Sequence, residues 1–200
     1  MNKILNHFKK NDPILYSYFC KVKILEPIKK DKPHNYFFRL SKEIICQQLS
    51  DKSGDAIFFR FKKLFSNSLV SPLDILSISH ELLRSVGMSN AKARYIRNLA
   101  EKIMHDDLQI HHYDRMADEE VIKDLTKVKG IGPWTAEMFL MFVLGREDVF
   151  SFGDLGLKKG IIRIYKFKKE PTEKQIEKII TRWTPYKTYA SRIIWASLEL

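Results

Sequence analysis

The chain has 200 residues, 44% of them hydrophobic, and its lysines and arginines outnumber its aspartates and glutamates by 11. This length is enough for one or two domains with a sizeable core. No apolar run can span a membrane, and residues 1–10 lack the apolar centre of a signal peptide, so we expect neither a membrane protein nor a secreted one. The positive excess favours a polyanionic partner.

Residues suited to metal or redox chemistry are few. Cys20 and Cys46 are the only cysteines, and the six histidines have no zinc-binding spacing. Two isolated thiols are typical of a reduced, cytoplasmic protein. They are too few for a four-cysteine iron–sulfur cluster, and we expect no required cofactor.

The N-terminal half predicts helices joined by short turns. Asp12-Pro13 suits an N-cap followed by a first helical position, and Ser89 suits the N-cap of a later helix, just after a helix stop at Gly87. Residues 26–34, with two prolines and a run of charges, indicate a linker or surface loop. The expected helices of this half cover residues 13–19, 35–49, 51–65 and, on either side of Gly87, 79–105.

Three basic residues, Lys92, Arg94 and Arg97, fall roughly on one side of the last of these helices. They form either a solvated basic surface or a set of phosphate contacts. The sequence favours neither alternative.

The stretch 118–144 predicts two helices around a very tight turn. Its first part is amphipathic, and its last ten residues are almost wholly apolar, as in a buried helix. In the turn, Gly130 and Gly132 tolerate backbone angles that other residues avoid, and Pro133 suits a first helical position. The bare N–H groups of such a helix start can bind a phosphate, and the simpler alternative is an ordinary glycine-capped turn.

The C-terminal third continues the helical pattern. Asp154 stands where an N-cap is expected, and Thr172 with Gln175 has the spacing of a capping box. Thr184-Pro185 suits the N-cap and first position of the final helix. Because no strand pattern is convincing anywhere, the predicted fold class is all-α.

The central stretch resembles the helix-hairpin-helix of a superfamily of DNA repair glycosylases, the helix-hairpin-helix/Gly-Pro-Asp superfamily. In that family an essential aspartate follows a Val-Phe pair one helix beyond the hairpin, and here Val149-Phe150 precedes Asp154. The resemblance is strongest to the 3-methyladenine DNA glycosylase II branch, through residues 44–50, the hairpin and residues 182–195, and it covers roughly residues 35–200. The hairpin positions that match are Leu125, Val128, Gly130, Ile131, Gly132 and Ala136.

The resemblance implies a two-lobed helical fold with the active site in a cleft between the lobes. Residues 1–34 would be an N-terminal segment packing on the helical body, too short for the β domain of longer relatives. Residues 35–200 would form the glycosylase region, with the hairpin at about 118–145. The implied partner is double-stranded DNA containing damaged bases, bound by a monomer in the cytoplasm, or on the nucleoid in a bacterium or archaeon.

By this resemblance Asp154 is the catalytic residue. A carboxylate beside the sugar C1′ can stabilise the developing positive charge of an oxocarbenium-like transition state or activate water, and both roles stay open. The helix dipole and N–H groups at a helix start would hold the negative charge in place. The chain departs from the family pattern at Ser151-Phe152-Gly153-Asp154, where the expected proline is missing, which puts the rigidity of this loop in question.

Trp134 occupies the hairpin position at which bifunctional relatives carry a nucleophilic lysine. An indole cannot form a Schiff base, so the resemblance implies a monofunctional glycosylase without AP-lyase activity. Trp134, together with Trp195 and Met138, would line a pocket for cationic purines such as 3-methyladenine and 7-methylguanine, held by stacking and cation–π attraction. For Trp195, a place in the core of the final helix is an equally good reading.

The resemblance also implies DNA contacts. Gln48, in the turn after the first long helix, would fill the gap left by an extruded base, and Gly130 and Gly132 would approach the phosphates. Lys129 is either solvated or phosphate-facing. The backbone carbonyls of Thr126, Val128 and Gly130 would hold a monovalent cation, Na⁺ or K⁺.

Two other functions fit parts of the sequence. The chain could be a non-catalytic DNA-binding protein that uses the hairpin only as a phosphate clamp. It could also be a glycosylase for deaminated or etheno-modified purines. Base release from damaged DNA separates these from the alkylpurine glycosylase that we favour.

Overall fold

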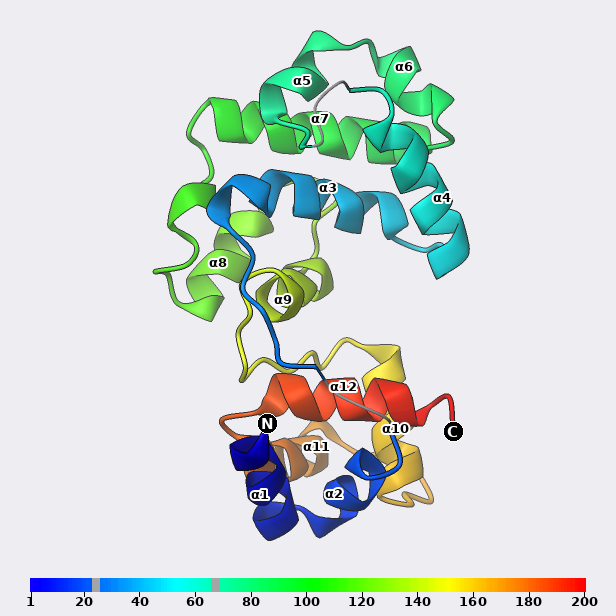
Figure 1. Cartoon of the computed structure of the whole chain (residues 1–200), viewed down its shortest axis with the longest axis vertical. Helices are drawn as coiled ribbons and strands as arrows, with labels where there is room; N and C mark the ends of the chain where they lie inside the picture. The colour runs from blue at the N-terminus through cyan, green and yellow to red at the C-terminus, as the bar shows by residue number, and fades with distance from the viewer. Residues whose placement is uncertain (23–25, 66–68) are drawn as a thin grey trace. The chain divides into compact units, whose positions relative to one another are not determined.

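The computed structural model describes residues 1–22, 26–65 and 69–200, and the regular structure of these residues is helical throughout, as the sequence predicts (Figure 1). The chain forms two compact units. The central unit is Lys30–Leu144, and the terminal unit joins Met1–Lys29 to Gly145–Leu200. The terminal unit therefore contains both ends of the chain, drawn in blue and in yellow to red in Figure 1.

The central unit is built around α3, which packs against α4, α7 and α9. Buried aromatic rings secure these contacts: Tyr36 of α3 and Tyr113 each meet the ring of Phe139 in α9 edge-on. The helices are η1 (Pro33–Asn35), α3 (Tyr36–Cys46), α4 (Asp51–Lys62), α5 (Pro72–Ser77), α6 (His80–Ser85), α7 (Asn90–Met104), η2 (Ile110–His112), α8 (Asp118–Leu125) and α9 (Pro133–Phe142).

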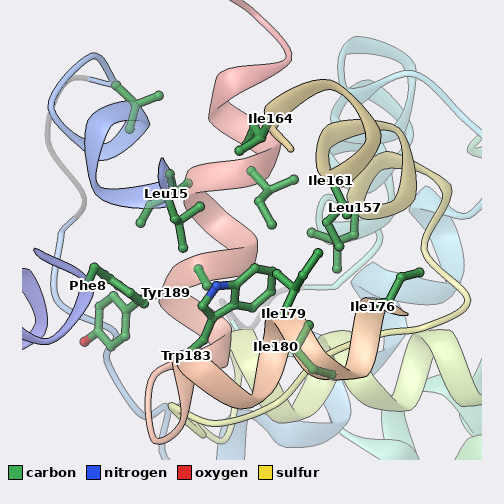
Figure 2. Packing of buried hydrophobic residues seen from close by; sticks show 14 of the residues in the cluster. Phe8, Leu15, Leu157, Ile161, Ile164, Ile176, Ile179, Ile180, Trp183 and Tyr189 are labelled. Atoms are coloured by element: carbon green, nitrogen blue, oxygen red, sulfur yellow. The ribbon is translucent and has the colours of Figure 1, made fainter. Parts of the chain in front are cut away.

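The terminal unit has its own core, in which the N-terminal helices pack against the C-terminal ones (Figure 2). Phe8 and Leu15 share this core with Leu157, Ile161 and the fully buried indole of Trp183. The helices are α1 (Asn2–Asn11), α2 (Pro13–Phe19), α10 (Leu155–Ile164), α11 (Glu173–Ile180), η3 (Thr181–Trp183) and α12 (Lys187–Ser197).

Asp12 fastens the two ends of the chain to each other. One of its oxygens accepts the Leu15 N–H at 3.0 Å and so caps α2, as predicted. The other accepts the Tyr165 hydroxyl at 2.6 Å and the Trp183 Nε1–H at 3.0 Å. Because this carboxylate is 1% exposed, its three bonds make the N-terminal segment an integral part of the terminal unit.

The predicted capping box at Thr172 and Gln175 opens α11, but the predicted start of the final helix at Thr184-Pro185 is wrong. Residues 181–183 form the 3-10 turn η3, and α12 begins only at Lys187. Asp148, which lies 39 positions earlier in the sequence, stabilises the start of α12, because its Oδ1 accepts the Lys187 N–H at 3.2 Å. Within the described ranges, no helix is long and apolar enough to cross a membrane.

Candidate functional site

Asp154 lies at the start of α10 and caps it. Its Oδ1 accepts the Leu157 N–H at 2.7 Å and, from α12, the Trp195 Nε1–H at 3.0 Å. The residue is only 9% exposed. The predicted N-cap is therefore confirmed, and the structure adds an indole partner that lies 41 positions away in sequence.

The loop before Asp154 is held by α12 rather than by a proline. Thr188, in the first turn of α12, accepts the Val149 N–H at 3.1 Å and donates to the Arg146 carbonyl at 2.7 Å. One helix thus fixes both the loop that carries Asp154 and the indole that binds its carboxylate. This arrangement answers the question of rigidity that the missing proline raises.

Gly156 allows the indole and the carboxylate to meet. A Cβ at this position would lie 3.1 Å from Asp154 Oδ1 and 3.1 Å from Trp195 Cδ1. Both are tighter than ordinary van der Waals contacts, so a side chain here would push the pair apart. Sequence reasoning missed Gly156, because only the position of α12 gives it a role.

Exposed apolar residues flank Asp154 in the sequence. Phe152 is 46% exposed and Leu155 is 71% exposed, one on each side of residues 153–154. Phe152 meets the ring of Phe150 edge-on, with 5.0 Å between the ring centroids. Apolar side chains near a bound sugar would reduce the competition from water and so strengthen the effect of a fixed negative charge.

The hairpin between α8 and α9 has the tight turn that the sequence predicts. Gly130 has φ of +98°, and a Cβ on it would lie 2.2 Å from the Tyr95 ring, so no other residue fits here without a change in the turn. Gly132 is the N-cap of α9, and nothing lies within 4 Å of where its Cβ would be. The start of α9 is therefore open to an approaching anion.

The predicted pocket residues of α9 differ in exposure. Trp134, in the first turn, is 41% exposed, whereas Met138, one turn later, is 6% exposed. Trp134 is therefore partly accessible to a ligand, whereas Met138 is almost wholly covered. Trp195 is half-buried, and it packs against the core of the terminal unit while its Nε1–H donates to Asp154. The two interpretations of Trp195, as a core residue and as a site residue, are therefore compatible.

The turn that carries Gln48 is tied to the hairpin. Gln47 Nε2 donates to the Gly130 carbonyl at 2.9 Å and to Thr135 Oγ1 at 3.1 Å. Gln48 itself is exposed and has φ of +55°, a left-handed conformation that is rare for residues other than glycine. The structure thus joins two predicted DNA-contacting elements within the central unit.

The basic residues of α7 have contacts that neither sequence alternative foresaw. Lys92 Nζ donates to the Ile45 and Gln47 carbonyls at 2.8 and 2.6 Å. Arg97 Nη1 donates to the Ile78 carbonyl at 2.8 Å, at the end of α5. Both side chains therefore complete the C-terminal ends of other helices, where carbonyl groups need donors.

The remaining predicted contacts of the hairpin stay predictions. Lys129 is exposed, and its backbone N–H donates to Asn98 Oδ1 at 3.2 Å. Of the three carbonyls predicted for a monovalent cation, that of Val128 accepts the Ile131 N–H at 3.0 Å and that of Gly130 accepts the Gln47 amide. A carbonyl oxygen has a second lone pair, so these bonds are compatible with a cation. Among the described residues, no cluster of three or more His, Cys, Asp or Glu could hold a metal ion.

Proteins of similar sequence are DNA glycosylases by name. DNA-3-methyladenine glycosylase 1 of Schizosaccharomyces pombe is 31% identical over 175 residues, which cover 86% of this chain and 75% of that protein. A putative DNA-3-methyladenine glycosylase of Bacillus subtilis, YfjP, is 32% identical over 80% of this chain, which spans only 58% of that relative.

Solved structures show the same fold. The S. pombe 3-methyladenine DNA glycosylase in complex with abasic DNA matches 99% of this chain and 97% of its own, with a TM-score of 0.82 and 29% identity. A DNA-3-methyladenine glycosidase of Bacillus halodurans matches 96% of this chain and 87% of its own, with a TM-score of 0.82 and 34% identity. The model of the HhH-GPD superfamily of base excision DNA repair proteins matches residues 41–186, and the chain belongs to this superfamily.

Proposed function

We propose that this protein is a monofunctional DNA glycosylase that hydrolyses the N-glycosidic bond of cationic alkylated purines, such as 3-methyladenine and 7-methylguanine, in double-stranded DNA. The names of its relatives support this substrate class. The observation that carries the proposal is the nearly buried Asp154 carboxylate, which the Leu157 N–H and the Trp195 indole hold in a fixed orientation.

In the proposed reaction the bond between C1′ and the purine nitrogen breaks, and its electron pair leaves with the base. The alkylated base is cationic before cleavage and therefore departs neutral, without a general acid. The sugar becomes positively charged, and the fixed charge of Asp154 stabilises it until water adds to C1′ and gives up one proton to solvent, which leaves a neutral abasic sugar. Preorganised charges of this kind contribute about 10²- to 10³-fold in rate. No step needs a cofactor.

Trp134 supports a hydrolytic reaction without strand cleavage. A lyase reaction needs an amine that attacks C1′ and forms a Schiff base, and the hairpin position that could supply it holds an indole instead. The exposed ring of Trp134 can stack on a cationic purine, an interaction worth roughly 1–2 kcal/mol in a desolvated site. We take the acting species to be a monomer.

Asp154→Asn tests the catalytic role, because it removes the charge and retains the shape and an oxygen for the Leu157 N–H. We expect single-turnover release of 7-methylguanine from methylated duplex to fall by about 10² or more. Binding to a duplex with a stable abasic-site analogue should stay within about threefold, because the DNA contacts are elsewhere. Glu170→Gln, which neutralises an exposed carboxylate of the same unit, is the matched control and should release base at the wild-type rate.

The same assay decides between the alternatives. A wild-type protein that binds duplex and releases no base from methylated, hypoxanthine-containing or etheno-containing DNA is a non-catalytic binding protein. Preferential release of hypoxanthine or ethenoadenine assigns the other glycosylase class. Strand cleavage without added alkali, or a protein–DNA adduct trapped by borohydride, contradicts the monofunctional assignment.

A further inference from the structure

The side chain of Lys92, in α7, holds the turn that carries Gln48. The ammonium group donates to two carbonyls at the end of α3, those of Ile45 and Gln47. These carbonyls have no partner within the helix, and a cation at a helix C-terminus also meets the negative end of the helix dipole. Desolvation lowers the pKa of Lys92, as expected for an ammonium group directed into the protein rather than toward water.

The side chain of Gln47 holds the same turn from the hairpin. Its amide bridges the Gly130 carbonyl and the Thr135 hydroxyl, at 2.9 and 3.1 Å. Residue 47 is therefore fixed twice, through its backbone carbonyl by Lys92 and through its side chain by the turn before α9. On the far side of the turn, Ser50 caps α4 by accepting the Ser53 N–H.

Between Gln47 and Ser50, Gln48 adopts a backbone conformation that is rare for a residue other than glycine. Its φ of +55° is left-handed, and its side chain is exposed. Non-glycine residues keep such a conformation only when their surroundings impose it. The Leu49 N–H donates to the Cys46 carbonyl at 3.2 Å and closes the turn around Gln48, and the bonds of Lys92 and Gln47 hold this turn in place.

We propose that Lys92 and Gln47 are positioning residues for base extrusion, which hold the 47–50 turn in the shape that inserts Gln48 into the duplex. The inference rests on the proposed glycosylase function. A preformed turn spares the reaction the entropy of ordering it when the base leaves the stack. Lys92 thus contributes to base release without touching a phosphate.

Salt dependence separates this role from direct DNA contact. The logarithm of the DNA-binding constant falls with the logarithm of the salt concentration, and each phosphate contact that is lost makes this slope shallower by about 0.9. A positioning lysine leaves this slope unchanged and lowers the rate of base extrusion instead. Arg94, an exposed residue two positions further along α7, provides the matched charge-removal control.

The experiment uses the full chain with Lys92→Met, Lys92→Arg, Gln47→Leu and Arg94→Met. Single-turnover release of 7-methylguanine is measured at saturating protein, and extrusion is followed by the fluorescence of 2-aminopurine placed beside the lesion. Binding to undamaged duplex is measured across salt concentrations.

We expect Lys92→Met and Gln47→Leu to slow both extrusion and release about tenfold or more, while the salt dependence of duplex binding keeps the wild-type slope. Lys92→Arg, which retains donors for both carbonyls, should recover most of the rate, and Arg94→Met should release base within about twofold of wild type.

Two results overturn the inference: a wild-type rate in both Lys92→Met and Gln47→Leu, or a loss of slope in Lys92→Met like that of a phosphate ligand. If Lys92→Met fails to fold, as judged by circular dichroism, Gln47→Leu decides the question from the other side of the turn. Failure of the proposed function is distinguishable, because the wild-type protein would then release no alkylated base at all.

Discussion

Two carboxylates with little exposure, Asp154 and Asp124, both accept several hydrogen bonds, but their surroundings differ. Asp124 Oδ2 accepts the Gln109 N–H and the Tyr113 hydroxyl, each at 2.8 Å, and its Oδ1 meets Lys127 Nζ at 2.6 Å. These bonds fasten the segment before α8 to α8 itself. Asp124 therefore has a structural role, whereas Asp154 is the carboxylate that we propose to act on the sugar.

The contacts of Asp124 predict how stability depends on pH. Burial by itself would raise the pKa of Asp124, but the bonds from Lys127, the Gln109 N–H and Tyr113 outweigh it and lower the pKa below the usual value. Because the folded-state pKa lies below the unfolded one, the stabilisation is complete above about pH 4 and is lost as the pH falls through the folded-state value.

We therefore expect Asp124→Asn to lower the free energy of unfolding by about 2 kcal/mol at pH 7. Urea titrations at pH 7, 5 and 3 should show the difference from wild type shrinking at the lowest pH, because the unfolded wild-type chain then binds a proton at residue 124 more readily than the folded chain does. A difference that stays constant over this range would show that Asp124 acts through its shape and not through its charge.

Sequence reasoning at the level of single residues succeeded where the partner is local. The local sequence predicts Asp12, Ser89 and Asp154 as N-caps. In the structure, each accepts the backbone N–H of the residue three positions later. The bonds of Lys92 and of Trp195 were missed, because their partners are 41 or more positions away. A long basic side chain on an amphipathic helix has the same sequence pattern whether it points to water or to the end of another helix.

At the level of elements, the helix–turn–helix of α8 and α9 offers two glycines with opposite requirements. Gly130 has a positive φ and stands against the Tyr95 ring. Gly132 has φ of −93° and open space around it, so its backbone suits any residue. The fold requires the first glycine. The second is not required by the fold, and we propose that it leaves room for a DNA phosphate at the start of α9.

Alanine at each position should separate these requirements. We expect Gly130→Ala to lower the free energy of unfolding by about 2 kcal/mol or more, as measured by urea denaturation, because both the backbone and the ring must shift. Gly132→Ala should unfold like wild type but bind duplex several-fold more weakly, because its methyl group covers the N–H groups that we expect to face a phosphate. Unchanged binding by Gly132→Ala would refute the phosphate site at α9.

Most helices follow from the sequence pattern, but α1, α5 and the start of α12 do not, and the last of these is informative. The turn from Gly130 to Pro133 and the capping box of α11 depend on neighbouring residues, which a pattern can reveal. The start of α12 depends instead on Asp148 and on the bonds of Thr188 to residues 146–149. Such tertiary contacts override a local Thr-Pro signal and leave no mark in the sequence around the helix.

The two units of the molecule differ in charge as well as in topology. Lysines and arginines exceed aspartates and glutamates by nine in the terminal unit, which contains Asp154, and by only two in the central unit. Most of the long-range attraction for DNA therefore comes from the unit that contains the proposed catalytic residue. The central unit contains the hairpin and the Gln48 turn, which we propose to contact DNA at close range.

The topology predicts that the central unit folds alone. It is one continuous segment with its own core around α3, so a 30–144 fragment should show cooperative urea unfolding and a helical circular dichroism spectrum. A 145–200 fragment lacks Phe8, Leu15 and the Asp12 carboxylate, and should stay largely unfolded until a 1–29 peptide is added. A 145–200 fragment that folds cooperatively by itself would contradict this division of the core.

Because the terminal unit is assembled from both ends of the chain, its completion follows the order of synthesis. On the ribosome, α1 and α2 emerge first and must wait for α10, α11 and α12 before they can bury their apolar side chains. Trp195 is made 41 positions after Asp154, so a polypeptide that has not yet reached α12 cannot orient this carboxylate. The ability to excise bases is thereby delayed until α12 has left the ribosome.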